Sequence, residues 1–326
     1  MHIILNSFGS SISKENGLFV IKNQQGKQFL NPEEVKSISI SKGASITSDA
    51  VLHAIHHEID ILFIDGVGMP KGRIWSSQYG SISTIRKNQV DFVYSQNAVF
   101  WIKKVLIEKL DNQIAILLTL PTNLHLLDRK IQAAVNTIED HKSKIAKIEG
   151  DIVSDIAASL RGWEGAASRK YFSIVSASLP FKYQFESRSH HPALDIFNAL
   201  LNYGYGMLYS KIEGCLIRAG VDPYVGIMHR DDYNRPVLVY DFIEKFRVWI
   251  DYVVIKLCVE DAFIDECFEN TNGSVLLVGL GKRILIQSIN DYFAEIIPIE
   301  NKERSRSTHI QEEAYSFARM LKNFSI

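Results

Sequence analysis

Four polar residues occupy stretches that are otherwise suited to a helical core, namely Glu164, His229, Asp241 and Glu244. Carboxylates from two segments and an imidazole from a third suit a hard divalent cation with one nitrogen ligand, so Mg²⁺ or Mn²⁺ is expected. Such an ion can promote attack on a phosphodiester. The residue types therefore predict metal-dependent chemistry on nucleic acid, provided that the three segments converge.

Asp241 and Glu244 are three residues apart in the stretch PVLVYDFIEKFR (236–247), which predicts a helix. This spacing places both carboxylates on one face. Their neighbours are mostly apolar, and two buried like charges are costly unless a cation or hydrogen bonds offset them. The alternative is a partly exposed acidic stripe that Lys245 and Arg247 neutralise, and the spacing alone does not decide between the two.

His229 follows a glycine-containing loop and lies 12 residues before Asp241. A loop of this length can bring the imidazole back onto the start of the carboxylate helix. Glu164 is flanked by small residues that let a neighbouring helix approach, so its carboxylate would be pressed into the interior unless it faced a cleft. The alternatives are a hydrogen-bonding surface histidine and a solvated helical glutamate.

Asn198 and Asn202 are four residues apart in an apolar stretch that predicts a long helix, so they share one face. Buried amides need hydrogen-bond partners. They could orient the carboxylates that bind the metal, cap a neighbouring loop or lock two helices together. The sequence leaves these alternatives open.

The composition is that of an ordinary globular protein, with 326 residues, 46% of them hydrophobic, and a net charge of −1. With this charge, nucleic acid would have to bind a local basic surface. Three cysteines without a CxxC pair argue against a disulfide framework and a structural zinc site, so we expect a reducing, cytoplasmic location. The N-terminus lacks the basic region of a signal peptide, and no apolar stretch is long enough to span a membrane.

Residues 1–87 are expected to form a small, mostly-β domain, because β-branched residues alternate there between turn residues. One helix is expected among the strands, with Ser48 as its N-cap. The strands are predicted at 2–7, 17–23, 36–42 and 60–65.

Residues 88–326 are expected to form a larger, all-α domain, because long helical periods begin there. Residues 124–148 predict a strongly amphipathic helix. A polar loop at 180–192 precedes another long helix that ends at Gly220. The predicted fold class is therefore α+β.

Several motifs follow one another in a characteristic order. They are Glu164-Gly165 with Tyr171-Phe172, NYGY (202–205), AGVDPYVG (219–226) with His229-Arg230, and LVYDFIEKFR (238–247). With the N-terminal segment SKGASITSDAVLHAIHHEIDILFIDGVGMPKGRI, they resemble the CRISPR-associated spacer-acquisition endonuclease/integrase family, the universal integrase of CRISPR adaptation. The resemblance covers nearly the whole chain, and the ordered set of motifs is specific although each motif alone is weak.

This resemblance implies a sandwich-like β domain followed by an α-helical catalytic domain. Glu164, His229 and Glu244 would be the ligands of Mg²⁺ or Mn²⁺, with Asp241 beside them in the catalytic site. The implied reaction is a transesterification that joins the 3′-hydroxyl ends of short donor (spacer) DNA into a repeat array in double-stranded DNA. The implied partners are a second copy of the chain, bound through the β domain, and a small second CRISPR adaptation protein.

Basic residues outside the metal site would hold the DNA, since phosphate contacts fix its register without reading its sequence. Each of them could instead be an ordinary solvated charge. The candidates are Arg73, Arg86, Lys87, Arg161, Arg169, Lys170, Arg188, Arg230 and Arg247.

Two other functions remain open. The first is a metal-dependent nuclease that cleaves branched DNA without integration, in which water attacks and no 3′-hydroxyl is joined. The second is a non-catalytic subunit of an adaptation complex with a vestigial acidic cluster. The intact set of carboxylates and the histidine speaks against the second.

Overall fold

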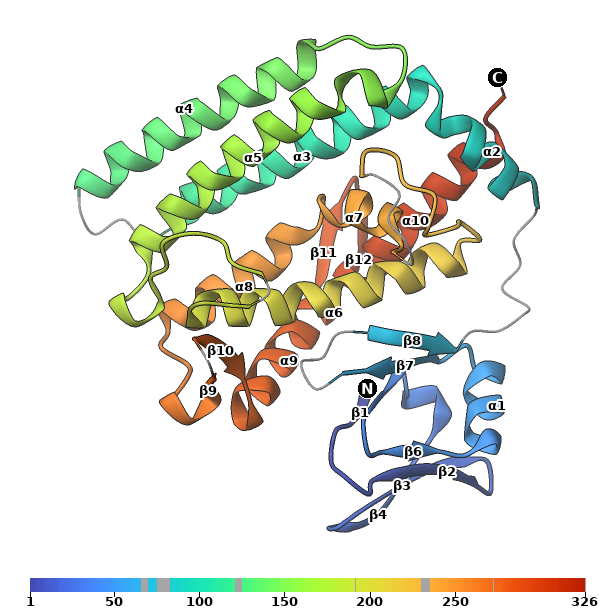
Figure 1. Ribbon diagram of the computed structural model, residues 1–326. Helices are drawn as coiled ribbons and strands as arrows, with labels where there is room; N and C mark the ends of the chain where they lie inside the picture. The colour runs from blue at the N-terminus through green and yellow to red at the C-terminus, as the bar shows by residue number, and fades with distance from the viewer. Residues whose placement is uncertain are drawn as a thin grey trace. The chain divides into compact units, whose positions relative to one another are not determined.

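The computed structural model describes residues 1–65, 70–74, 83–120, 125–190, 192–229, 235–271 and 273–325. It divides into two units, Met1–Gly80 and Ser81–Ile326 (Figure 1). Helix α2 begins at Ser83, so helical structure starts slightly before residue 88.

Two small sheets build the N-terminal unit. The strand order in the first is β1 (His2–Leu5), β5 (Ser37–Ser41), β7 (Asp60–Ile64) and β8 (Pro70–Ile74). In this sheet β5 lies parallel to β1 and β7, and β8 is antiparallel to β7. The order in the second is β4 (Gly26–Leu30), β3 (Leu18–Asn23), β2 (Ser11–Glu15) and β6 (Ser45–Ile46). A 3₁₀ turn, η1 (Pro32–Glu34), precedes β5.

The two sheets share one core. Ile38 and Ile40 on β5 are buried, as are Ile12 on β2 and Phe19 on β3. Alternate residues of β5 face this core, as expected from the two-residue period of a strand. The shared core gives the unit the sandwich-like character that the sequence predicted.

Helix α1 (Ser48–His56) packs against this core through Ala50 and Ala54. The predicted N-cap, Ser48, is wrong by one position, because Ser48 is already helical. Thr47 has extended backbone angles, and its hydroxyl accepts a hydrogen bond from the backbone N–H of Ala50 at 3.3 Å.

Helices form most of the C-terminal unit, which confirms the predicted fold class. The described part of this unit also contains strands and 3₁₀ turns that the expected all-α domain did not include. The strands form two hairpins, β9 (Phe268–Thr271) with β10 (Ser274–Leu277) and β11 (Ile296–Ile299) with β12 (Lys302–Ser305), and the turns are η2 (Phe181–Tyr183) and η3 (Asp265–Cys267). The helices are α2 (Ser83–Val93), α3 (Gln96–Thr119), α4 (His125–Lys147), α5 (Val153–Ser178), α6 (Ile196–Arg218), α7 (Val237–Ile243), α8 (Arg247–Val259), α9 (Gly279–Ala294) and α10 (Arg306–Lys322).

The long helices α3, α4 and α5 run side by side (Figure 1). On α3, Val99, Ile102, Leu106 and Leu110 recur at helical spacing and are buried in one core. Across the described ranges, each helix is too short or too polar to traverse a lipid bilayer.

The single helix expected over 236–247 is interrupted. α7 ends at Ile243, Glu244 is its C-cap, and α8 begins at Arg247. The backbone N–H of Phe246 bonds to the carbonyl of Ile243 at 2.9 Å, which is the tighter spacing of a 3₁₀ turn. Glu244 itself keeps helical backbone angles, so the break in the helix lies after it.

Candidate functional site

Glu164 and Glu244 contact the same ammonium group. Glu164 lies on α5, Glu244 ends α7, and Lys109 lies on α3. Lys109 Nζ lies 2.5 Å from Oε1 of Glu164 and also donates to Oε2 of Glu244. The side chains of Lys109 and Glu244 are each only 8% exposed. The three helices therefore place two carboxylates within reach of one buried cation.

Arg247 holds the other oxygen of Glu244. Its Nε donates to Oε1 at 2.9 Å. Burial alone would raise the pKa of Glu244, but Arg247 and Lys109 outweigh it and lower that pKa to about 2. Burial likewise disfavours charge on Lys109, yet Glu244 and Glu164 raise its pKa. Glu244, Lys109 and Arg247 are thus charged at neutral pH.

Asp241 organises the loop that carries His229. Its buried carboxylate accepts hydrogen bonds from the backbone N–H groups of Ile227 at 2.7 Å, Met228 at 3.1 Å and His229 at 3.2 Å. Gly226 begins this turn, and a Cβ there would lie 2.7 Å from Cγ2 of Val237. Only glycine therefore lets the loop approach α7 this closely.

The imidazole of His229 is oriented by the same carboxylate. Nδ1 lies 2.6 Å from Oδ1 of Asp241, and with the proton on Nδ1 the other nitrogen, Nε2, is left to bind a ligand. Burial lowers the pKa of His229, but Asp241 and then Glu244 outweigh burial and raise it. A carboxylate behind a histidine is the usual support of a metal-binding imidazole.

The donor set fits Mg²⁺ or Mn²⁺, since Glu164 and Glu244 already share one cation and His229 is held in a ligand-like tautomer. The pair of glutamates and the histidine do not, however, surround one common point. Within the described residues, no three His, Cys, Asp or Glu side chains are arranged to hold a metal ion. The assignment of Glu164, His229 and Glu244 as metal ligands therefore remains a prediction. In this structure the ammonium of Lys109 is the cation between the two glutamates.

A groove of about 340 Å³ lies beside His229. Arg161, which was predicted to contact DNA, lines it and donates to the carbonyl of Met228 at 3.2 Å. The exposed Tyr94 lines it as well. The groove thus combines a guanidinium and an aromatic ring next to the histidine.

Asn198 and Asn202 contact the loop before α6 and not the glutamates. Asn198 Nδ2 donates to the carbonyl of Ser187 at 2.9 Å, and Asn202 Nδ2 donates to that of Ser189 at 3.0 Å. Arg188 donates to Oδ1 of both. These bonds correspond to the loop-capping alternative, and they use Arg188 inside the protein.

The other predicted DNA contacts are distributed unevenly. Arg86 and Lys87 on α2 and Arg169 on α5 are exposed, and Lys170 is half-buried. Arg247 is bound to Glu244, and Arg73 pairs with Asp60 at 3.2 Å. Arg230 lies outside the described residues.

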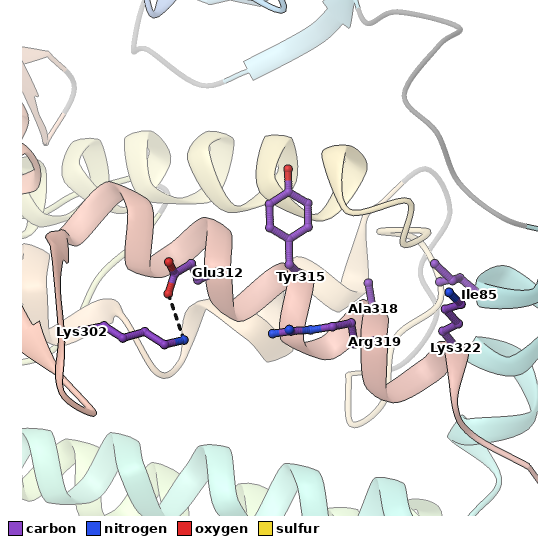
Figure 2. Close-up of a pocket in the computed structure, with 7 residues that line it drawn as sticks. All are labelled: Ile85, Lys302, Glu312, Tyr315, Ala318, Arg319 and Lys322. Carbon is purple, nitrogen blue, oxygen red and sulfur yellow. Dashed lines mark hydrogen bonds and ion pairs between the residues drawn. The ribbon is translucent and has the colours of Figure 1, made fainter.

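A second groove, of about 470 Å³, lies along α10 (Figure 2). Lys302 faces Glu312 there at 3.5 Å, whereas Arg319 and Lys322 have no acidic partner in the part of the chain that the structure describes. None of the four predicted catalytic residues lines it. The lining residues are Ile85, Lys302, Glu312, Tyr315, Ala318, Arg319 and Lys322.

A family model, CRISPR associated protein Cas1, matches residues 3–291 of the chain. A CRISPR-associated endonuclease Cas1 1 of Archaeoglobus fulgidus is 30% identical over 303 residues, which cover 89% of this chain and 87% of the relative. The protein of the same name from Pyrobaculum aerophilum is 32% identical over 262 residues, or 79% and 82% of the two chains. This chain belongs to the Cas1 family, which confirms the predicted family.

Solved structures share the fold. A Cas1 protein from Thermotoga maritima superposes with a TM-score of 0.82 at 17% identity, covering 100% of this chain and 98% of that one. A casposase bound to integration product gives a TM-score of 0.82 at 21% identity, covering 98% and 90%. The strand-rich unit followed by the helical unit is therefore the Cas1 fold.

Proposed function

We propose that this protein is a Mg²⁺- or Mn²⁺-dependent DNA endonuclease and integrase of CRISPR adaptation. The observation that carries the proposal is the pair Glu164 and Glu244 around one cation, together with a histidine oriented by Asp241, in a member of the Cas1 family. Relatives named endonucleases support the nuclease activity, and the shared fold with a casposase bound to integration product supports joining.

Each residue has a separate task in the proposed mechanism. Glu164, Glu244 and Nε2 of His229 would hold the ion, which would offset charge on the phosphate and favour ionisation of the attacking hydroxyl. Asp241 keeps the imidazole in the required tautomer and orientation. Arg161 in the neighbouring groove would bind a backbone phosphate.

The proposed reaction conserves the number of phosphodiester bonds. The 3′-oxygen of the donor DNA attacks a phosphorus atom of the repeat, one phosphodiester forms and one breaks, and the displaced 3′-oxygen takes up a proton. The reaction therefore needs no nucleotide hydrolysis to supply energy. Plain cleavage would differ only in that water replaces the donor hydroxyl.

The DNA surface would include both grooves. Arg319 and Lys322 line the groove on α10, and we propose that the exposed Arg86 and Lys87 of α2 add further phosphate contacts. Double-stranded DNA is the proposed partner there. A small adaptation protein is the second proposed partner, because fold relatives include a chain of a Cas6-RT-Cas1–Cas2 complex, with a TM-score of 0.81 at 20% identity, covering 99% of this chain and 35% of that one.

The test is a joining assay with donor DNA, a supercoiled plasmid that carries the repeat, Mn²⁺ or Mg²⁺, and the small partner if one is encoded nearby. We expect covalent attachment of the donor, with loss of joining but not of binding when the donor ends in a dideoxynucleotide. Glu164→Gln should reduce joining at least about a hundredfold, since it removes a ligand charge.

The matched control is Glu149→Gln, which changes an exposed glutamate near the start of α5 and should join normally. Full activity of Glu164→Gln would contradict the assigned site. A plasmid that is nicked with no donor attached would instead establish the branched-DNA nuclease function.

A further inference from the structure

Lys109 is a buried charge that the proposed mechanism does not use. It lies on α3, one turn before Gln113, and its ammonium contacts Glu164 and Glu244. A divalent ion that binds the same two carboxylates meets this ammonium as a like charge at close range. The ammonium and the ion therefore compete for the same oxygen atoms.

A small cavity adjoins the ammonium. Its volume is about 20 Å³, which is enough for one water molecule or a displaced amino group. The lining residues are Lys109, Gln113, Ser168, Phe172, Tyr205, Arg247, Val248 and Asp251.

Gln113 offers an unused acceptor at this cavity. Ser168 donates its single hydroxyl proton to Glu164 Oε1 at 2.7 Å, so Ser168 Oγ accepts from Nε2 of Gln113 at 3.3 Å. This fixes the orientation of the amide. Oε1 of Gln113 is buried and has no hydrogen-bond partner among the described residues. A buried acceptor without a donor is unusual enough to require an explanation.

We infer that Lys109 is a displaceable internal cation that neutralises Glu164 and Glu244 in the metal-free protein and moves to Gln113 Oε1 when a divalent ion binds. This inference rests on the proposed function, because it requires a metal at the two glutamates. Lys109 is a positioning residue. It holds the two carboxylates close together before the ion arrives, and Gln113 stabilises the ammonium afterwards.

The first test is calorimetric titration of the full-length protein with Mn²⁺ alone, without DNA. Lys109→Met keeps the length of the side chain and removes its charge, so no ammonium must be displaced. We expect at least about tenfold tighter Mn²⁺ binding and a larger rise in melting temperature on adding Mn²⁺ than in the wild type. Lys104→Met, at an exposed lysine of the same helix, is the control and should bind as the wild type does.

The second test isolates the acceptor. Gln113→Leu leaves the displaced ammonium without a partner, so Mn²⁺ binding should weaken about tenfold, the size of effect seen for groups behind metal ligands. In the Lys109→Met background the same change should have no effect on affinity, because no ammonium needs the acceptor. A purely structural role of Gln113 would instead weaken binding in both backgrounds.

Unchanged or weaker Mn²⁺ binding by folded Lys109→Met would overturn the inference. Should that variant fail to fold by circular dichroism, Gln113→Leu alone decides, and wild-type affinity in it is the contrary result. A wild-type protein that binds no Mn²⁺ overturns both this inference and the metal dependence of the proposed function. If the Lys109 and Gln113 variants change Mn²⁺ affinity as expected but the wild type joins no donor DNA, the inference stands and only the integrase function is rejected.

Discussion

Asp251 is a buried carboxyl group next to the proposed site. It accepts hydrogen bonds from the hydroxyl of Tyr171 at 3.1 Å and from that of Tyr205 at 2.5 Å. Burial raises its pKa to about 6, even though both tyrosines lower it. The group therefore binds its proton more tightly in the folded protein than in the unfolded chain.

This shift predicts a pH dependence of stability. Because the pKa is raised on folding from 3.8, the stabilisation is complete below about pH 4 and is lost as pH rises through about 6. The loss amounts to roughly 3 kcal/mol. Asp251→Asn stays neutral throughout, so its free energy of unfolding minus that of the wild type should increase by about this amount between pH 4 and pH 7.

Denaturant unfolding at several pH values measures the free energy of unfolding of both proteins. An effect of the new amide that does not depend on pH cancels when the difference at pH 4 is subtracted from that at pH 7. Asp265→Asn, which changes an exposed carboxyl on η3, is the control and should give a nearly flat difference. A flat difference for Asp251→Asn as well would show that Asp251 is ionised in the folded protein at pH 5.

At the scale of elements, Gly204 allows α6 and α8 to pack closely. A Cβ at Gly204 would lie 2.5 Å from Cγ2 of Ile250 on α8. Gly204→Ala gains up to about 1 kcal/mol in helix propensity, but overpacking a tight core costs about 1–3 kcal/mol. We expect a net loss of roughly 1–2 kcal/mol in the free energy of unfolding.

Gly162→Ala is the matched control, because this helical glycine on α5 is exposed and a Cβ there would meet nothing within 4 Å. It should stabilise the protein by about 0.5–1 kcal/mol. In thermal unfolding, the melting temperature should fall for Gly204→Ala and rise for Gly162→Ala, if packing determines the effect of the added methyl group. Equal stabilisation of the two would mean that α6 and α8 can move apart without cost.

The elements themselves were largely predictable from sequence. The predicted helix at 124–148 is observed as α4, His125–Lys147, because amphipathic periodicity is a local property. The break after Ile243 was not predictable, since the stretch 236–247 has a continuous helical pattern. Nor was the contact of Glu244 with Lys109 predictable, because it depends on packing between helices.

The site shows the same limit. Chemistry and order along the chain led to the prediction of Glu164, His229, Asp241 and Glu244 as site residues, and this assignment stays a prediction. They did not reveal Lys109, whose partners are 55 and 135 residues away in the chain. The sequence did offer Arg247 as a partner of the acidic pair, and the structure shows this contact with Glu244, but only the fold determines that the carboxylate is buried and not exposed.

At the scale of the whole molecule, we predict a homodimer that forms through the N-terminal unit. Phe29 is 53% exposed on β4, which is at the edge of its sheet, and Phe8 in the same unit is 85% exposed. An edge strand carries unpaired backbone groups that can pair with a second chain, and exposed aromatic rings add apolar contact area.

Light scattering coupled to size-exclusion chromatography should give twice the mass of the 37.0 kDa chain at micromolar concentration. Phe29→Lys places a charge on the edge strand, which opposes strand pairing, so it should shift the protein toward monomer. Phe181→Lys changes a ring that is 91% exposed in the C-terminal unit and should leave the dimer intact. A monomeric wild type would contradict the predicted dimer. A dimer that is lost only in Phe181→Lys would place the interface in the C-terminal unit, because the predicted contact depends on the edge of the N-terminal sheet.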